Sequence, residues 1–253
     1  QSCNSSLNDS LVYVHGDSQS PELSFTRGFQ LQQEYGVNVI VFSWPSKDPE
    51  LGGIKNFHQS RIRIEKGTPG FVDFLYELDE WHDTNGRKTN SKLSLFLHSL
   101  GNYYLERSAD DIRLNGNRME IFDNLVMNAA AINEKDHNQW LSKIHLQKRI
   151  FVNSNRKDMT LKGVTLFTDF GVQLGEEAIH GFADNAIYIN FGQALKNEIN
   201  FGLLHGYYAG EVPGRSEKIY NYYHTIFHGN DPDLLNSSVF TTNDTIPVFD
   251  INF

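Results

Sequence analysis

Short apolar segments alternate along the chain with longer segments of helical character. Each apolar segment is rich in aliphatic or aromatic residues and is bounded by polar residues, glycine or proline, which is typical of strands buried on both faces of a parallel sheet. The predicted strands cover residues 11–14, 37–43, 93–97, 123–131, 149–153 and 185–191. Because strands and helices alternate, the pattern predicts an α/β fold with a mainly parallel sheet of about six strands and right-handed crossovers.

Helical segments between these strands are predicted over residues 22–35, 56–81, 103–109, 139–145 and 218–228. Pro69 predicts a break or a fresh start inside the second of these helices. Residues 159–184 are expected to be irregular with one or two short helices, and residues 192–206 to form a loop. The apolar C-terminal residues 246–253 either pack as an edge strand or cover part of a cleft.

The length and composition favour one globular domain. No low-complexity hinge divides the 253 residues, so we expect a polar tail, residues 1–10, and a single domain, residues 11–253. Hydrophobic residues make up 39% of the chain, yet no apolar run approaches the roughly 20 residues that a membrane helix requires. The net charge of −9 argues against nucleic-acid binding, which depends on clustered Lys and Arg.

The N-terminal residues bear on cellular location. The single cysteine, Cys3, excludes an intramolecular disulfide, and its place in the polar tail argues against a buried catalytic thiol. The chain starts at Gln1 without an initiator Met, which fits a removed signal peptide or a trimmed chain. Of these, we expect export to the periplasm or the medium, with the cytoplasm as the alternative. The oligomeric state is left open by the sequence.

A serine stands at the turn after the third predicted strand. Residues 97–101 fit the nucleophile-elbow pattern GxSxG at Ser99 and Gly101, whereas Leu97 replaces the first glycine. Such a turn lifts the serine hydroxyl above the sheet and aims backbone amides at a developing oxyanion. The alternative is that Ser99 only caps the following helix.

The first predicted strand ends in His15, Gly16 and Asp17. A glycine at this point allows a sharp turn and leaves amide groups facing the space above the edge of the sheet. In a hydrolase, the amide of Asp17 would supply one oxyanion donor, and the amide of Leu100 the other. The alternative is an ordinary strand-to-helix turn. Ala129, at the end of the fourth predicted strand, begins a run of small residues that would leave room for a substrate.

A serine hydroxyl becomes a nucleophile when a histidine takes its proton and a carboxylate fixes the histidine tautomer. In hydrolases built on such a sheet, serine, acid and histidine follow in that chain order, each after a later strand. Ser99 after the third predicted strand, Asp158 after the fifth and His205 after the sixth satisfy this order. They are therefore the predicted catalytic residues.

Other residues compete for the acid and base roles, with Asp136 and Asp184 as alternative acids and His180, His224 and His228 as alternative bases. The last two histidines fall in a predicted helix, whereas the role usually belongs to a loop. We expect His98 to point away from the serine beside it. No HExxH motif or close His/Asp cluster is present, so neither a metal nor another cofactor is expected.

These strings resemble the α/β-hydrolases, and more closely a bacterial branch with largely unassigned substrates that is described as esterase- or lipase-like. The resemblance spans residues 11–208 and rests on Val14-His15-Gly16, Phe42-Ser43-Trp44-Pro45-Ser46, His98-Ser99-Leu100-Gly101-Asn102, Asp158 with Leu161, and His205-Gly206-Tyr207-Tyr208. It implies the α/β-hydrolase fold and the triad Ser99, Asp158 and His205. Almost nothing precedes the first strand, so the antiparallel N-terminal strands of the superfamily are expected to be missing.

Two classes of function remain for the chain. The first is a serine hydrolase that cleaves a small carboxylic ester through an acyl-enzyme; the same triad also suits an amidase, a peptidase or a thioesterase. The second is a binding protein that has kept the fold without activity, an alternative motivated by the missing first elbow glycine.

Overall fold

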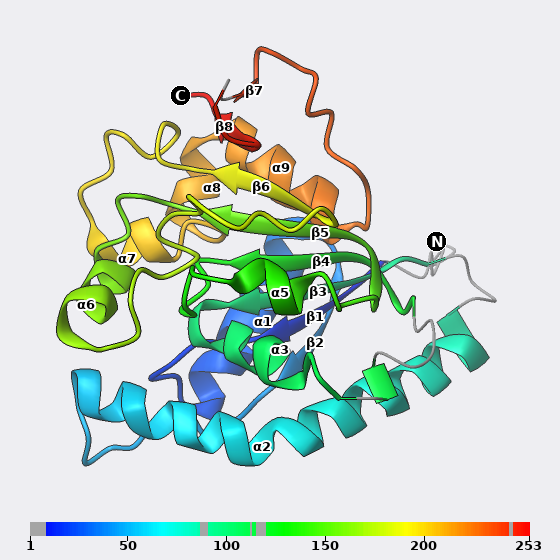
Figure 1. Ribbon diagram of the computed structural model, residues 1–253. Coiled ribbons are helices and arrows are strands. Elements are labelled where there is room, and N and C mark those ends of the chain that lie inside the picture. The colour runs from blue at the N-terminus through cyan, green and yellow to red at the C-terminus, as the bar shows by residue number, and fades with distance from the viewer. Residues whose placement is uncertain (1–8, 87–90, 112, 115–119, 243–244) are drawn as a thin grey trace.

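The computed structural model describes residues 9–86, 91–111, 113–114, 120–242 and 245–253; Cys3 and most of the polar tail lie outside them. An eight-stranded sheet with the strand order β2-β1-β3-β4-β5-β6-β8-β7 runs through the described residues (Figure 1). Its strands are β1 Ser10–Val14, β2 Asn38–Phe42, β3 Leu93–His98, β4 Phe122–Asn128, β5 Gln147–Ser154, β6 Ala186–Asn190, β7 Phe240–Thr242 and β8 Val248–Ile251. All neighbouring strands are parallel except β7 and β8.

The two edges of the sheet are harder to predict than its centre, where parallel strands alternate with helices. In the described part of the chain β2 is one edge of the sheet. At the other edge, β8 pairs in parallel with β6 and in antiparallel with β7. The C-terminal residues therefore enter the sheet as a strand, as one of the two alternatives predicted, but this strand lies between β6 and β7, and β7 forms the edge.

Helices cover both faces of the sheet. They are α1 Pro21–Tyr35, α2 Gly53–Trp81, α3 Asn102–Ser108, α5 His137–Leu141, α6 Met159–Phe167, α7 Phe201–His205, α8 Glu211–Arg215 and α9 Glu217–Phe227, with short turns at η1 His82–Gly86 and η2 Ser99–Gly101. Helices α1 and α9 lie against one face, and α2 and α3 against the other (Figure 1). None of the described helices is long and apolar enough to cross a membrane.

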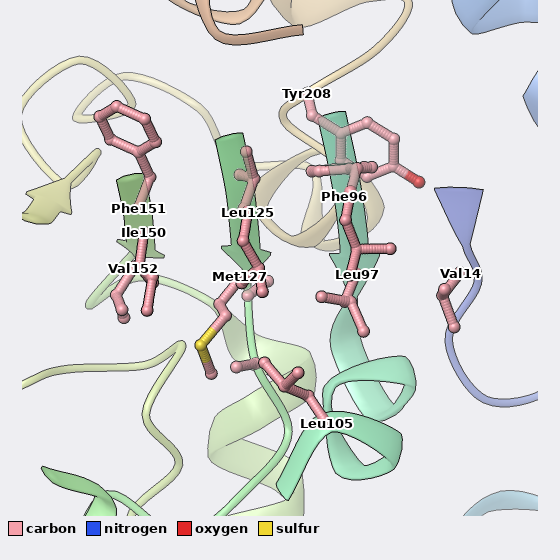
Figure 2. Packing of buried hydrophobic residues seen from close by; sticks show 14 of the residues in the cluster. Val14, Phe96, Leu97, Leu105, Leu125, Met127, Ile150, Phe151, Val152 and Tyr208 are labelled. Carbon is pink, nitrogen blue, oxygen red and sulfur yellow. The ribbon is translucent and has the colours of Figure 1, made fainter. Parts of the chain in front are cut away.

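Side chains of the central strands alternate between the two helical layers, as parallel strands buried on both faces require. The ring of Phe96 on β3 lies 4.8 Å from that of Tyr208 and 5.0 Å from that of Phe227 on α9 (Figure 2). On the other layer, the ring of Phe42 lies 5.1 Å from that of Phe71 on α2. The core therefore lies on both sides of β1, β3, β4 and β5.

The predicted break at Pro69 is wrong, because α2 continues through it. Proline removes one backbone hydrogen bond, but Ile64, Phe71 and Val72 on either side of it are fully buried. Their packing holds the helix together across the proline. The prediction of a loop over residues 192–206 is also incomplete, since residues 201–205 within it form α7.

The small residues after β4 do not leave room for a substrate, which corrects that expectation. Ala129 and Ala130 are fully buried beneath the segment that contains Gly175. The Gly175 amide donates to the Ala130 carbonyl at 2.9 Å, and its carbonyl accepts from the Asn155 amide at 2.9 Å. The small side chains thus allow this segment to tie the end of β4 to the end of β5.

We expect Gly175→Ala to lower the free energy of unfolding by about 3 kcal/mol or more, because backbone atoms cannot move aside for the added methyl group. A Cβ at this position would lie 2.0 Å from the Ala130 nitrogen. Gly163→Ala on α6 is the matched control, because a Cβ there meets no atom within 4 Å. It should raise the free energy of unfolding by roughly 0.5–1 kcal/mol. Urea denaturation measures both values, and equal stability of the two variants would contradict the packing described here.

Candidate active site

Ser99 occupies a strained turn between β3 and α3. Its φ is 53°, in the left-handed region that residues other than glycine seldom adopt. Backbone strain of this kind costs roughly 1–3 kcal/mol and persists only where the surroundings enforce it. Ser99 itself is 7% exposed at the end of a fully buried strand. The turn therefore has the form of a nucleophile elbow rather than of a simple helix cap.

Two glycines make this turn possible. A Cβ on Gly101 would lie 2.7 Å from the His15 carbonyl oxygen and 2.9 Å from that of Val14, at the end of β1. A Cβ on Gly16 would lie 2.7 Å from the Ser99 Cβ. The turns after β1 and β3 thus touch without intervening side chains. Leu97, at the position of the absent first elbow glycine, is fully buried in the core.

The Asn102 side chain stabilises the backbone of the turn at Ser99 through hydrogen bonds. Its Nδ2 donates to the carbonyls of Leu97 at 3.1 Å and Ser99 at 2.9 Å, and Asn102 is fully buried. The Ser99 carbonyl also accepts from the Ala131 amide at 3.1 Å. Asn102 entered the sequence interpretation only as the last letter of a motif, and no local pattern revealed this bracing role.

Asp158 and His205 lie in direct contact. Asp158, fully buried, caps the N-terminus of α6 by accepting from the amides of Thr160 and Leu161 through Oδ1. Its Oδ2 accepts from His205 Nδ1 at 2.6 Å. His205 is the last residue of α7, and its side chain is 15% exposed. A buried carboxylate that orients a partly exposed imidazole in this way is the arrangement that general-base catalysis requires.

The alternative acids and bases lie elsewhere. Asp136 and Asp184 are both exposed, and the His180 side chain is 78% exposed. His228 contacts Asp9 Oδ2 through Nδ1 and the carbonyl of Tyr35 through Nε2, at the opposite end of the sheet, where β1 begins. His224, one helical turn before His228, packs its ring on that of His228.

His98 contacts the candidate base, which the sequence did not indicate. Its ring centroid lies 4.7 Å from that of His205 and 4.7 Å from that of Tyr208. His98, the last residue of β3, thus connects this strand with the residue pair Asp158 and His205. Burial, together with the charge on His205, lowers the pKa of His98 well below its ordinary value.

The loop after β1 is held by His15. Trp44 donates from its backbone amide to His15 Nε2 at 3.1 Å and from its indole to the His15 carbonyl at 2.9 Å, and the two rings stack 5.3 Å apart. Because Nε2 accepts a hydrogen bond, the proton resides on Nδ1, which donates to the Gly16 carbonyl at 2.9 Å. His15 is thus neutral and fully buried, and it fixes the position of the predicted oxyanion loop.

The Trp44-Pro45-Ser46 string completes the support of this loop. The Ser46 hydroxyl accepts from the Gln19 amide, and its carbonyl accepts from the Ser18 amide and from Asn56 Nδ2. Asn56, on α2, also donates to Asp17 Oδ1 at 2.8 Å. Among the described residues, the amide of Asp17 has no hydrogen-bond acceptor, so it is available to a ligand. Nothing in the local sequence of α2 pointed to Asn56.

The sequence matches one family over residues 3–179, described as "Alpha/beta hydrolase of unknown function (DUF900)". The chain belongs to this family. The match covers β1 to β5 and therefore the turns that carry Gly16, Ser99 and Asp158, whereas His205 lies beyond it. No curated protein matches the sequence of this α/β-hydrolase.

Two solved structures are similar to this α/β-hydrolase. One is the Pyrobaculum calidifontis esterase, with 15% identity, coverage of 87% of this chain and 76% of the other, and a TM-score of 0.43. Another is a thermostable carboxylesterase cloned from a metagenomic library, with 11% identity, coverage of 89% and 81%, and a TM-score of 0.42. Likeness at this level does not indicate a substrate.

We expect His15 to make the hydrolase less stable in mild acid. Burial lowers the pKa of His15 in the folded protein, so the unfolded chain takes up a proton at a higher pH than the folded one. The free energy of unfolding must then fall as pH falls below about 6.5. In His15→Gln, the slope between about pH 5 and 6.5 should be smaller by up to about 1.4 kcal/mol per pH unit. Urea titrations at several pH values measure the slope, and identical slopes would exclude this role.

Proposed function

We propose that the protein is a serine hydrolase that cleaves small carboxylic esters with Ser99 as nucleophile, His205 as base and Asp158 as the orienting acid. One observation carries the proposal: a serine with positive φ stands at the end of the central strand β3, and a buried Asp–His pair follows later strands in the required chain order. The α/β-hydrolase family to which the chain belongs supports it.

The reaction begins with a proton transfer from Ser99 Oγ to His205 Nε2. Asp158 accepts from Nδ1, so the hydrogen on the ring stays on that side and the lone pair of Nε2 faces outward. The serine oxygen bonds to the ester carbonyl carbon, and the ester C–O bond then breaks. The alcohol leaves with the proton that His205 carried. A water molecule, deprotonated by His205 in turn, releases the acid from the acyl-enzyme and restores Ser99.

The negative oxygen of the tetrahedral intermediate requires donors that are in place beforehand. We assign this role to the amides of Asp17 and Leu100, with Gly16 providing the close approach. Contact between Gly16 and the Ser99 side chain supports the assignment, since it brings the loop after β1 to the nucleophile. The Asn56 and Ser46 hydrogen bonds keep that loop rigid. Preorganised donors of this kind are worth roughly 10²–10³ in kcat each.

The same residues would cleave amides, peptides or thioesters, and a protein without activity could also retain them. A panel of matched ester, amide and thioester substrates distinguishes these hydrolase activities from one another. Labelling of the intact protein by a fluorophosphonate, with mass mapping of the modified residue, tests whether the protein has any such activity. Modification of Ser99 excludes a silent binding protein, whereas a folded protein that stays unlabelled favours one.

We expect Ser99→Ala to lower kcat for p-nitrophenyl acetate by at least about 10³, because no other group can form the acyl-enzyme. Ser94→Ala, in the same strand, is the matched control. Within the described residues its hydroxyl donates to the Ile226 carbonyl, which also accepts from Asn124, so activity should persist. Thermal unfolding verifies that both variants fold. Unchanged turnover in Ser99→Ala would refute the proposal.

Asp158→Asn should separate the two roles of Asp158. An asparagine still accepts from the Thr160 and Leu161 amides as the cap of α6, so the melting temperature should change little. Without the carboxylate, the His205 tautomer is no longer held, and kcat should fall by about 10²–10⁴. Asp158→Ala should lose both cap and activity. If Asp158→Asn keeps kcat within about threefold, Asp158 is only a cap.

A further inference from the structure

The side chain of His98 lies in a stack of three rings beside the proposed triad. Its centroid is 4.7 Å from that of His205, with 49° between the planes, and 4.7 Å from that of Tyr208 on its other side, at 55°. His98 is 9% exposed, and its Nδ1 has no hydrogen-bond partner in the described part of the chain. A buried nitrogen without a partner carries a cost of about 1–3 kcal/mol. The imidazole also interacts with the backbone of Asn128, which acts to raise its pKa, but that interaction does not account for the packing of the ring between His205 and Tyr208.

The hydrogen bond to Asp158 still allows the His205 ring to tilt. Asp158 holds Nδ1 at 2.6 Å, but the ring can still tilt about that bond. A tilt moves Nε2, on the far side of the ring, which is the atom that takes the serine proton. Misplacement by about 1 Å can cost 10²-fold in rate. The ring of His98, packed against that of His205, limits the tilt in its direction.

The surroundings keep His98 neutral. Burial has the largest effect in lowering the pKa of His98; the neighbouring His205, Arg27 and His15 act in the same direction, and the Asn128 backbone acts against them. The groups that face the stack from each packed element are Asp158 at the start of α6, Tyr207 and Tyr208 after α7, Tyr13 on β1, His15 after β1 and Arg27 on α1. Asp158 is committed to His205. When His205 takes a proton, it therefore meets an uncharged aromatic ring, which attracts a cation.

We infer that His98 is a positioning residue for His205: its neutral ring holds the imidazole at the tilt that proton transfer needs and stabilises the imidazolium that forms. This inference rests on the proposed function, because it assigns His98 a part in the same reaction. Its role depends on the aromatic ring rather than on either nitrogen. A phenyl ring should therefore replace it, whereas an aliphatic side chain of similar size should not.

The test compares His98→Phe with His98→Leu, using p-nitrophenyl acetate as substrate. His98→Phe should keep kcat within about threefold, whereas His98→Leu should lose about tenfold in kcat with KM unchanged. In His98→Leu the acidic limb of the kcat/KM profile should also move to lower pH by about half to one unit, because the imidazolium loses its facing ring. Thermal unfolding checks each variant, and His98→Met replaces His98→Leu if the latter does not fold.

Phe96→Leu is the matched control. Phe96 lies two residues earlier on the same face of β3 and packs on Tyr208 at 4.8 Å. The Phe96→Leu substitution should lower the melting temperature while leaving the acidic limb of the kcat/KM profile at the wild-type pH. If the wild type is active and His98→Leu keeps its kcat and its pH profile, the inference about His98 is wrong, although the proposed function stands. The same conclusion follows if the acidic limb shifts equally in Phe96→Leu. A wild type that neither turns over esters nor becomes labelled at Ser99 overturns the proposed function, and the inference with it.

Discussion

The close approach of the turns after β1 and β3 is the constraint on which the rest of the site depends. Gly101 packs against the carbonyls of Val14 and His15, and Gly16 packs against the Ser99 side chain. Side chains at either glycine would push the two strand ends apart. The positive φ of Ser99 persists because this packing, together with the hydrogen bonds of Asn102, leaves no relaxed alternative. Proximity of the serine to the oxyanion loop follows from adjacency of β1 and β3 in the sheet.

Two neutral, buried histidine side chains pack against the elements that form the candidate site. His15 fixes the loop after β1 through Trp44, and His98 fills the space between His205 and Tyr208. Both histidines have lowered pKa values because burial disfavours their charged forms. A histidine that stays neutral can accept a hydrogen bond, as His15 does, or present an aromatic face, as His98 does, without placing a charge in the core. The proposed mechanism assigns proton transfer to His205, which is more exposed.

Asp158 links the stability of the fold to the chemistry of the site. One carboxylate oxygen caps α6, while the other orients His205 at the end of α7. The two helices pack against each other, so Asp158 and His205 are positioned by a single small unit after β5 and β6. Loss of the cap would move both residues. The cost of burying this carboxylate is offset because Oδ1 accepts from two amides of α6 and Oδ2 from His205.

The sequence by itself determined the α/β class, the approximate positions of β1 to β6 and the sharp turn at Ser99, because these depend on local periodicity and on glycines at strand ends. Chain order also singled out Asp158 and His205, whose direct contact only the tertiary structure could reveal. Tertiary packing decided that α2 continues through Pro69, that the segment around Gly175 fills the space above Ala129 and Ala130, and that His98 stacks on His205. Each of these depends on residues far apart in the chain. Their contacts outweigh local preference once the sheet has brought them together.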